Sequence, residues 1–186
     1  MSQESSLPRL FRRPTVFASD LTAPNMLHAV TLRSTRPRGS IGELPRLRVP
    51  ADVHLFGADD VPGVNSLSIG GGSHPVLAAG QVSYVGQPIA VLAGPDIRRV
   101  HQSLELLQPE YGDEEAVLDE DSDSAEIAGE RFAERGNPDG ELRDAFQIVQ
   151  GTYRTGPQEH LYSEPQAVFA TPEGTESVTV YTSTQW

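Results

Sequence analysis

The sequence predicts an α+β fold in which mostly antiparallel or mixed strands outnumber the helices. Apolar residues on both sides of a Gly-Gln-Pro break mark two strands between Gln81 and Leu92. A stripe of apolar residues marks one helix over residues 95–108. Two strand-like runs near the end, 167–171 and 178–184, flank a Pro-Glu-Gly turn. Because strands and helices do not alternate regularly, antiparallel pairing is favoured over a doubly wound sheet.

The first part of the chain reads as short strands joined by irregular segments. Residues 26–34 alternate in a pattern that predicts a strand with apolar side chains on both faces. Residues 35–47 are rich in Arg, Pro and Gly and are expected to be irregular, whereas 52–56 predict a short strand. The triple glycine within 63–73 indicates a flexible loop rather than a phosphate cradle, because a proline follows where a helix would have to begin.

The predicted helix over 95–108 has a recognisable start. Pro95 and Asp96 suit its first turn, and its apolar positions are Ile97, Val100, Leu104 and Leu107. His101 lies near this stripe and is interpreted as a histidine at the helix edge, because no second metal ligand is near it in the sequence. A short strand is expected to follow at 116–118.

An acidic stretch over 113–126 separates this part from the rest of the chain. A calcium-binding loop is one interpretation, but the glycine and glutamate spacing of an EF-hand is missing. A solvated acidic linker over 121–138 is therefore preferred. After the linker, residues 139–146 predict a short helix and residues 148–155 predict a further strand.

Composition excludes several kinds of chemistry. The 186 residues contain no cysteine, which excludes disulfides, thiolate nucleophiles and cysteine-bound zinc or iron–sulfur sites. All 14 basic residues are arginine, so neither a Schiff-base lysine nor a phosphate-loop lysine exists. The net charge of −12 and the lack of aromatic residues between the arginines argue against a nucleic-acid partner. The apolar runs are too short to span a membrane and the N-terminus lacks the pattern of a secretory signal, so we expect no membrane partner and a cytoplasmic location.

Polar and aromatic residues concentrate near the end of the chain, in the segment 156–166. Its amide and titratable side chains include Gln158, Glu159, His160, Tyr162 and Glu164. A carboxylate beside a histidine can serve as an acid–base pair or as two metal ligands, whereas the plainer interpretation is a polar loop that hydrogen-bonds backbone. In an extended chain Glu159 and His160 face opposite ways, which favours the polar loop.

Gln185 follows the last strand-like run. Its neutral amide offers two donors and an acceptor and does not exchange protons near neutral pH. Such a group is suited to holding an oxo or carbonyl group in a cleft.

A series of short motifs occurs in order along the chain. They are Phe17-Ala18-Ser19-Asp20, Met26-Leu27-His28-Ala29 with Arg33-Ser34, Tyr84-Val85-Gly86-Gln87-Pro88-Ile89-Ala90, Glu110-Tyr111, Ala116-Val117-Leu118-Asp119, Gly151-Thr152-Tyr153-Arg154-Thr155, Gln158-Glu159-His160-Leu161-Tyr162-Ser163-Glu164-Pro165-Gln166 and Ser183-Thr184-Gln185. Together they resemble the N-terminal part of the molybdenum-binding catalytic subunit of the xanthine dehydrogenase/aldehyde oxidase family, the molybdenum hydroxylases.

This resemblance implies a domain organisation. We expect a flexible arm over residues 1–14, an α/β-hammerhead domain over 15–120, the acidic linker over 121–138, and the incomplete start of a molybdopterin-binding region over 139–186.

The resemblance also implies roles for individual residues. By match, Gln185 sits beside the molybdenum and hydrogen-bonds an oxo ligand, while Gln158, Glu159, His160 and Glu164 belong to a supporting loop. In relatives the catalytic base and the glycine-rich cofactor segment lie further along, beyond the position of Trp186. No catalytic residue and no metal ligand is therefore expected within this segment.

Members of this family hydroxylate aldehydes, purines or aromatic N-heterocycles with oxygen from water, and electrons leave through iron–sulfur clusters to flavin or another acceptor. The resemblance thus implies a segment of such an enzyme that is inactive alone and binds no cofactor alone. The complete assembly would hold a molybdopterin-type molybdenum cofactor. The implied partners are the remainder of the catalytic subunit, or a separate chain carrying it, and iron–sulfur and FAD subunits or domains. The alternative functions are a non-catalytic hammerhead-type interaction or assembly module and, third, a calcium-binding module.

Overall fold

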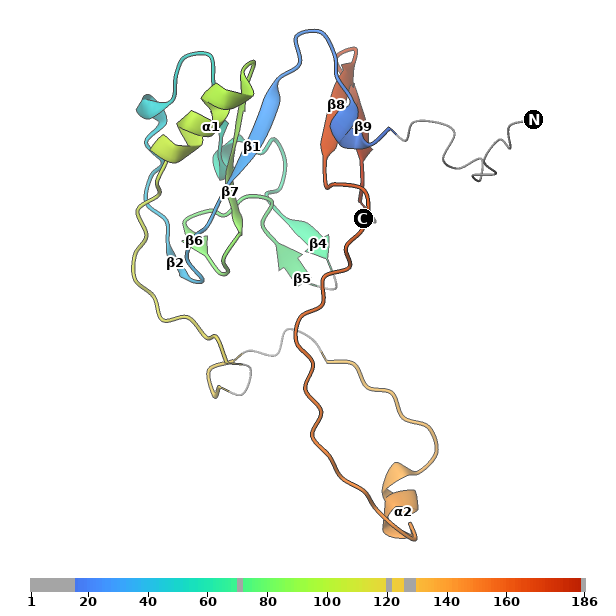
Figure 1. Ribbon diagram of the computed structural model, residues 1–186. Coiled ribbons are helices and arrows are strands. Elements are labelled where there is room, and N and C mark those ends of the chain that lie inside the picture. Colours follow the sequence, from blue (N-terminus) through green and yellow to red (C-terminus); the bar gives the residue numbers. More distant parts are fainter. Residues whose placement is uncertain (1–15, 70–71, 120–121, 126–129, 185–186) are drawn as a thin grey trace, which may run out of the picture. The chain divides into compact units, whose positions relative to one another are not determined.

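The computed structural model describes residues 16–69, 72–119, 122–125 and 130–184 (Figure 1). The chain divides into two compact units, and each has its own secondary structure. The first unit consists of residues 25–144, and the second consists of residues 145–186 with the N-terminal residues up to 24. The predicted arm over 1–14 lies outside the described residues.

A three-stranded antiparallel sheet forms the centre of the first unit. Its strands are β1 (His28–Arg33), β7 (Pro88–Gly94) and β3 (His54–Phe56), in the order β1-β7-β3. Most side chains of β7 are buried, and β7 is the central strand with a neighbour on each side. Helix α1 (Ile97–Leu106) packs against β1 and β7, and Figure 1 shows it lying beside these strands.

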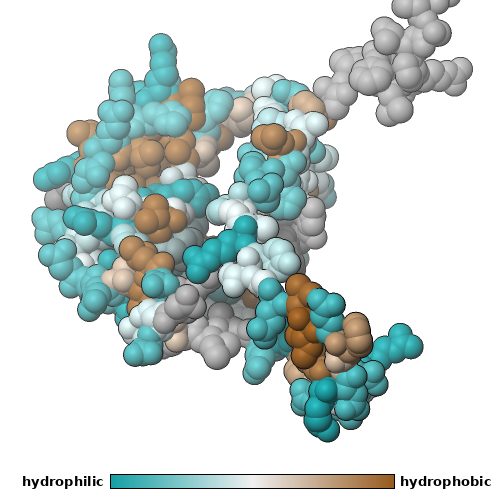
Figure 2. Space-filling view, turned by 60° about the horizontal axis from the view of Figure 1, so that its bottom comes forward, coloured by the Kyte–Doolittle hydropathy of each residue, from teal (hydrophilic) through white to brown (hydrophobic). Residues whose placement is uncertain are grey.

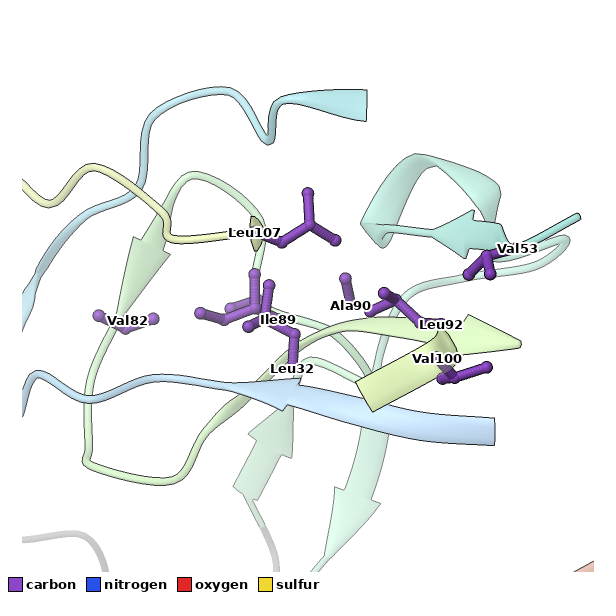
Figure 3. Close-up of a cluster of buried hydrophobic side chains, with 9 residues drawn as sticks. Leu32, Val53, Val82, Ile89, Ala90, Leu92, Val100 and Leu107 are labelled. Atoms are coloured by element: carbon purple, nitrogen blue, oxygen red, sulfur yellow. The ribbon is translucent and has the colours of Figure 1, made fainter. Parts of the chain in front are cut away.

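Leu92 lies at the centre of this packing. It is opposite Val30 of β1 and Leu55 of β3, so these three side chains share one face of the sheet. Leu92 and Val100 of α1 are both fully buried (Figure 3). The other buried members of the cluster are Leu32, Val53, Ala78, Val82, Ile89, Ala90 and Leu107. One face of the sheet and one side of the helix therefore form the hydrophobic core.

The predicted helix over 95–108 is confirmed with shorter bounds. Asp96 is its N-cap: a side-chain oxygen of Asp96 accepts a hydrogen bond from the backbone amide of Arg98 at 2.9 Å. This contact satisfies an amide that has no partner within the first turn, so the helix begins at Ile97. His101 is exposed, in agreement with its interpretation as a histidine at the helix edge.

Two short pairs of strands complete the first unit. β2 (Gly39–Ser40) pairs with β6 (Gln81–Val82), and β4 (Leu67–Ile69) pairs with β5 (Gly72–His74). The loop predicted over 63–73 is therefore wrong in part, because residues on both sides of 70–71 form an antiparallel pair. The hydroxyls of Ser66 and Ser73 hydrogen-bond across this pair at 2.6 Å.

The Gly-Gln-Pro break is a bend and not a hairpin, since β6 and β7 pair with different strands. Gln87 is buried and holds the bend from two sides. Its side-chain oxygen accepts from the backbone amide of Ser83 at 2.6 Å, and its backbone carbonyl accepts from the amide of Ser34 at 2.9 Å.

After α1 the chain returns to β2, and residues 110–112 bond to residues 40–42 at a crossing of the two segments. Ile41 and Tyr111 form an isolated antiparallel bridge, and the amide of Gly112 donates to the carbonyl of Ser40 at 3.0 Å. A β-carbon at Gly39 would overlap the carbonyl oxygen of Gly112, and one at Gly112 would overlap the hydroxyl of Ser40. The crossing therefore requires a glycine at Gly39, where the clash is with backbone, whereas at Gly112 the Ser40 side chain would have to move aside.

Two predicted strands do not form. Residues 116–118 and 148–155 have no regular secondary structure, because no neighbouring strand among the described residues supplies the backbone hydrogen bonds that a strand needs. The helix predicted over 139–146 is shorter: α2 (Pro138–Arg143) begins after Asn137, whose side chain accepts from the amide of Gly140 at 3.1 Å.

The second unit contains an antiparallel hairpin, β8 (Val168–Glu173) and β9 (Ser177–Thr182), and the short 3₁₀ helix η2 (Ala18–Asp20). Both strand-like runs predicted here are confirmed. Pro172 and Glu173 belong to β8, so the turn begins one or two residues later than expected. The mostly antiparallel α+β fold is also confirmed. Across the described parts of the chain, no helix has the length and apolar character needed to cross a lipid bilayer.

Replacing Leu92 by alanine tests the core. We expect Leu92→Ala to lower the free energy of unfolding of the first unit by about 2–5 kcal/mol, because it leaves a cavity between sheet and helix. Leu118→Ala, at an exposed position, should change it by less than about 0.5 kcal/mol. Denaturant unfolding followed by far-ultraviolet circular dichroism measures both values. Equal losses in the two variants would contradict the assigned core.

The side chain of Asp60 connects the turn at Gly57 to the side chain of Arg46. It ends the 3₁₀ helix η4 (Ala58–Asp60), and its Oδ2 accepts from the amide of Gly57 at 2.7 Å and from Nη2 of Arg46 at 2.9 Å. The amide of Gly57, followed by the guanidinium of Arg46, holds the pKa of Asp60 below its ordinary value of 3.8. The folded state therefore favours the charged carboxylate.

This shift predicts a pH dependence for Asp60→Asn. Because the folded pKa is below the unfolded pKa, the carboxylate stabilises the fold above the unfolded pKa and this contribution disappears as the pH falls through the folded pKa. The variant should melt at a lower temperature than the wild type at neutral pH, and the difference should shrink between about pH 5 and pH 3. Thermal unfolding at stepped pH measures this, with Asp59→Asn as the exposed control. A difference that grows on acidification would contradict it.

Candidate functional site

The segment 158–166 lies in the second unit, before β8, and contains no helix or strand. Gln158, Glu159 and His160 are exposed. The hydrogen bond that involves the pair at 159–160 runs from the backbone amide of His160 to Oε1 of Glu159 at 3.1 Å. Because this contact is made by the backbone, the imidazole of His160 and the neighbouring carboxylate do not form an acid–base pair in the described structure.

Glu164 differs from the other three residues of the predicted supporting loop because it contacts a distant part of the chain. It is half-buried, and its Oε1 accepts from the backbone amide of Ala18 at 3.2 Å. This amide lies at the start of η2, where no carbonyl of the helix can accept from it. Glu164 therefore attaches the N-terminal residues of the second unit to the segment before the hairpin.

Ser183 brings the two C-terminal motifs together. Its hydroxyl donates to the carbonyl of Pro165 at 3.0 Å and accepts from the amide of Ala167 at 3.3 Å. The serine of the Ser-Thr-Gln motif thus fixes the end of the Gln-Glu-His segment beside the end of β9. The sequence analysis assigned no separate role to Ser183. Its position in the Ser-Thr-Gln motif, two residues before Gln185, could have indicated one. Gln185 itself lies outside the described residues.

Surface hollows occur in both units. In the second unit a hollow of about 450 Å³ is lined by Val16, Phe17, Ala18, Leu21, Glu164, Val180, Tyr181 and Thr182. In the first unit a hollow of about 770 Å³ is lined mainly by residues 41–46, 57–59 and 78–80, with Arg48 and Ile89. The first-unit hollow contains none of the residues that the sequence singled out for chemistry.

The described residues alone do not form a pocket that fits a molybdenum cofactor. Among them, no three His, Asp or Glu side chains gather closely enough to hold a metal ion. The hollow beside Glu164 is open to solvent, and its wall combines apolar side chains with the polar groups of Glu164, Tyr181 and Thr182. Gln158 and His160 carry suitable hydrogen-bonding groups, but these groups do not converge on one enclosed space. No reaction step is therefore assigned to these residues alone.

The comparisons with known proteins define the class of the chain. Residues 14–115 match the sequence profile of the a/b hammerhead domain of aldehyde oxidase and xanthine dehydrogenase. Residues 120–186 match the profile of the molybdopterin cofactor-binding domain. The hammerhead match covers most of the first unit, and the molybdopterin-binding match begins in the last part of that unit and continues through the second. The chain belongs to the aldehyde oxidase and xanthine dehydrogenase family, which confirms the resemblance found in the sequence.

Individual relatives are much longer than this chain. It is 30% identical over 183 residues to a probable xanthine dehydrogenase component from Bacillus subtilis (strain 168), covering 91% of this chain and 24% of that protein. It is 29% identical over 182 residues to the nicotinate dehydrogenase large molybdopterin subunit of Eubacterium barkeri, covering 91% of this chain and 43% of that subunit. The fold matches aldehyde oxidoreductase from Desulfovibrio gigas with a TM-score of 0.73 at 19% identity, covering 90% of this chain and 21% of that one.

Removing the hydroxyl of Ser183 tests its role as a link. In Ser183→Ala we expect the amide of Ala167 to exchange with solvent about 2- to 10-fold faster, because one net hydrogen bond of about 0.5–1.5 kcal/mol is lost. Hydrogen exchange followed by nuclear magnetic resonance measures this rate. Ser163→Ala, an exposed serine of the same segment, is the matched control and should leave the rate unchanged. Equal rates in the Ser183 variant and the wild type would exclude the link.

Proposed function

We propose that this chain is part of the catalytic subunit of a molybdenum-dependent hydroxylase or dehydrogenase, and that it becomes active only with the remainder of the molybdopterin-binding region. The substrates are aldehydes, purines or N-heterocycles, with water as the oxygen source. One observation supports this function most directly: the hammerhead profile over 14–115 is followed by the molybdopterin-binding profile over 120–186.

The surface of the second unit supports the requirement for a further polypeptide. Phe146, Val149, Tyr153 and Leu161 are 103%, 83%, 90% and 84% exposed. Hydrophobic residues, brown in Figure 2, are visible at the surface of the molecule. Full burial of one such side chain is worth about 1.5–3 kcal/mol, so leaving several exposed on one short segment is costly. A chain that supplies a complementary apolar surface would recover this stabilisation.

Within the proposed enzyme, the residues of this chain act as positioning groups. The amide of Gln185 would donate a hydrogen bond to an oxo ligand of the bound cofactor, while Ser183 links the chain two residues before it to Pro165. The loop that contains Gln158, Glu159, His160 and Glu164 supports the wall of the site. The molybdenum cofactor supplies the redox chemistry of the hydroxylation when it is bound. Iron–sulfur and FAD subunits or domains would supply the electron acceptors of the assembly.

Reconstitution tests this function. The chain is co-expressed with the polypeptide that carries the remaining molybdopterin-binding region from the same genome, in cells that make the cofactor. We expect a stable complex with one molybdenum per catalytic unit by elemental mass spectrometry, and oxidation of an aldehyde, purine or N-heterocycle. The chain alone should show neither. Association without molybdenum would instead support the non-catalytic assembly module, and no association would reject both.

Gln185 gives a sharper test in the reconstituted complex. Gln185→Ala is expected to lower kcat by about 10²-fold, the effect typical of losing one fixed donor at a reacting oxygen. The molybdenum content should stay near that of the wild type, because an oxo ligand is not a protein ligand of the metal. Gln150→Ala, at an exposed amide of the same unit, should keep full turnover. An unchanged kcat in the Gln185 variant would reject the assigned role.

A further inference from the structure

The β8–β9 hairpin presents an apolar face that the described residues leave uncovered. Directly opposite residues of an antiparallel pair share a face, so the pairs Ala170–Val180 and Pro172–Val178 lie on the same side of the hairpin as Val168. Thr182, opposite Val168, lies on this side as well, and we call the five other residues the apolar hairpin face. Val168, Val178 and Val180 are 69%, 61% and 51% exposed, and none of the five is charged.

The opposite face of the hairpin has internal contacts instead. The rings of Phe169 and Tyr181 lie 6.1 Å apart across the pair, and the hydroxyl of Thr179 donates to the carboxylate of Glu173. Phe169 and Thr179 are also less exposed than their neighbours along each strand. The two faces therefore differ: one has contacts between its own side chains, and the other consists of aliphatic side chains with Thr182 at one end.

The apolar hairpin face continues into the hollow of about 450 Å³ beside η2. Val180 belongs to both, and Val16, Phe17 and Leu21 supply further apolar lining on the other side. The hollow is large enough for an apolar side chain from another polypeptide. A contiguous exposed apolar patch on a protein surface commonly marks a protein–protein contact, and the adjoining hollow offers both apolar and polar groups.

A second copy of this chain is a poor occupant for this face. Each copy has a net charge of −12, and Glu173 and Glu176 flank the turn at the end of the hairpin. Stacking two such hairpins would bring like charges together, which opposes association. An isolated two-stranded hairpin is at best marginally stable in water, so some other surface has to cover it.

The comparisons indicate what that surface is. The hairpin lies within the part that matches the molybdopterin-binding profile, and the chain covers 24% and 43% of two matching relatives. Most of such a relative therefore lies outside the 186 residues. A fold match that covers 90% of this chain accounts for 21% of its counterpart, so this fold also occurs as a small part of a much longer chain.

We propose that the apolar hairpin face and its adjoining hollow are the docking surface for the polypeptide that carries the remainder of the molybdopterin-binding region. That polypeptide places aliphatic side chains of a strand or helix against the valines and inserts one apolar side chain into the hollow beside η2. This inference rests on the proposed function and assigns its partner contact to named residues.

Neighbouring residues of β9 provide a matched pair of variants. Ser177 and Val178 are both exposed, but consecutive residues of a strand point to opposite faces. Val178→Glu should weaken binding of the purified remainder polypeptide on the order of tenfold or more, because it buries a charge in an apolar contact. Ser177→Glu should change the affinity by less than about twofold. Isothermal titration calorimetry measures both, and equal affinities would overturn the proposal.

Cysteine labelling provides an independent measurement, because the chain has no cysteine of its own. Val180→Cys should react with a maleimide in the isolated chain and react about tenfold more slowly after the remainder polypeptide is added. Ser177→Cys should react equally fast in both states. If the wild-type chain binds the remainder polypeptide but the cysteine of Val180→Cys is not protected from the maleimide, this docking surface is wrong and the proposed function stands. Absence of association would overturn both, and protection in the isolated chain with dimer formation would assign the face to a second copy.

Discussion

The packing of α1 against β7 is the interaction on which the first unit depends. β7 is the one strand in the described sheet with a neighbour on each side, and Leu92 at its centre meets both neighbours and the helix. The cap at Asp96 fixes where α1 begins, and an ion pair from Arg99 to Asp52 at 2.9 Å connects the helix to the turn before β3. All of these contacts hold α1 against β7. The loops at the edges of the unit can therefore differ while the sheet and helix stay packed.

The parts of this fold that were predictable from sequence are those that depend on local patterns. The stripe through Val100 and Leu107 predicted α1, and apolar residues around a Gly-Gln-Pro break predicted β6 and β7. The family and the mostly antiparallel fold also followed from the order of short motifs. What periodicity did not reveal is pairing between distant residues. β6 pairs with β2, which is distant in the sequence. β4 pairs with β5, whereas the glycines between them had predicted a loop. Conversely, 148–155 has the pattern of a strand but no neighbour among the residues that the structure describes.

The candidate site shows the same division. Glu164 and Ser183 both lie in motifs that the sequence brought to attention, but their contacts are with Ala18 and with Pro165 and Ala167, far along the chain or across the hairpin. No spacing rule joins such residues, because their separation is decided by how the hairpin folds back. The structure places Gln158, Glu159 and His160 on an exposed segment, and their supporting role stays a prediction, as do the role of Gln185 and the expected domain bounds.

The crossing of the chain at Gly39 and Gly112 limits how this domain can diverge. A larger residue at Gly39 would force the two backbones apart, and one at Gly112 would displace the Ser40 side chain, whereas the core around Leu92 involves neither position. A side chain at Gly39 would therefore act first on the contact between β2 and the segment that leads into the acidic stretch, and the buried cluster would feel it only indirectly.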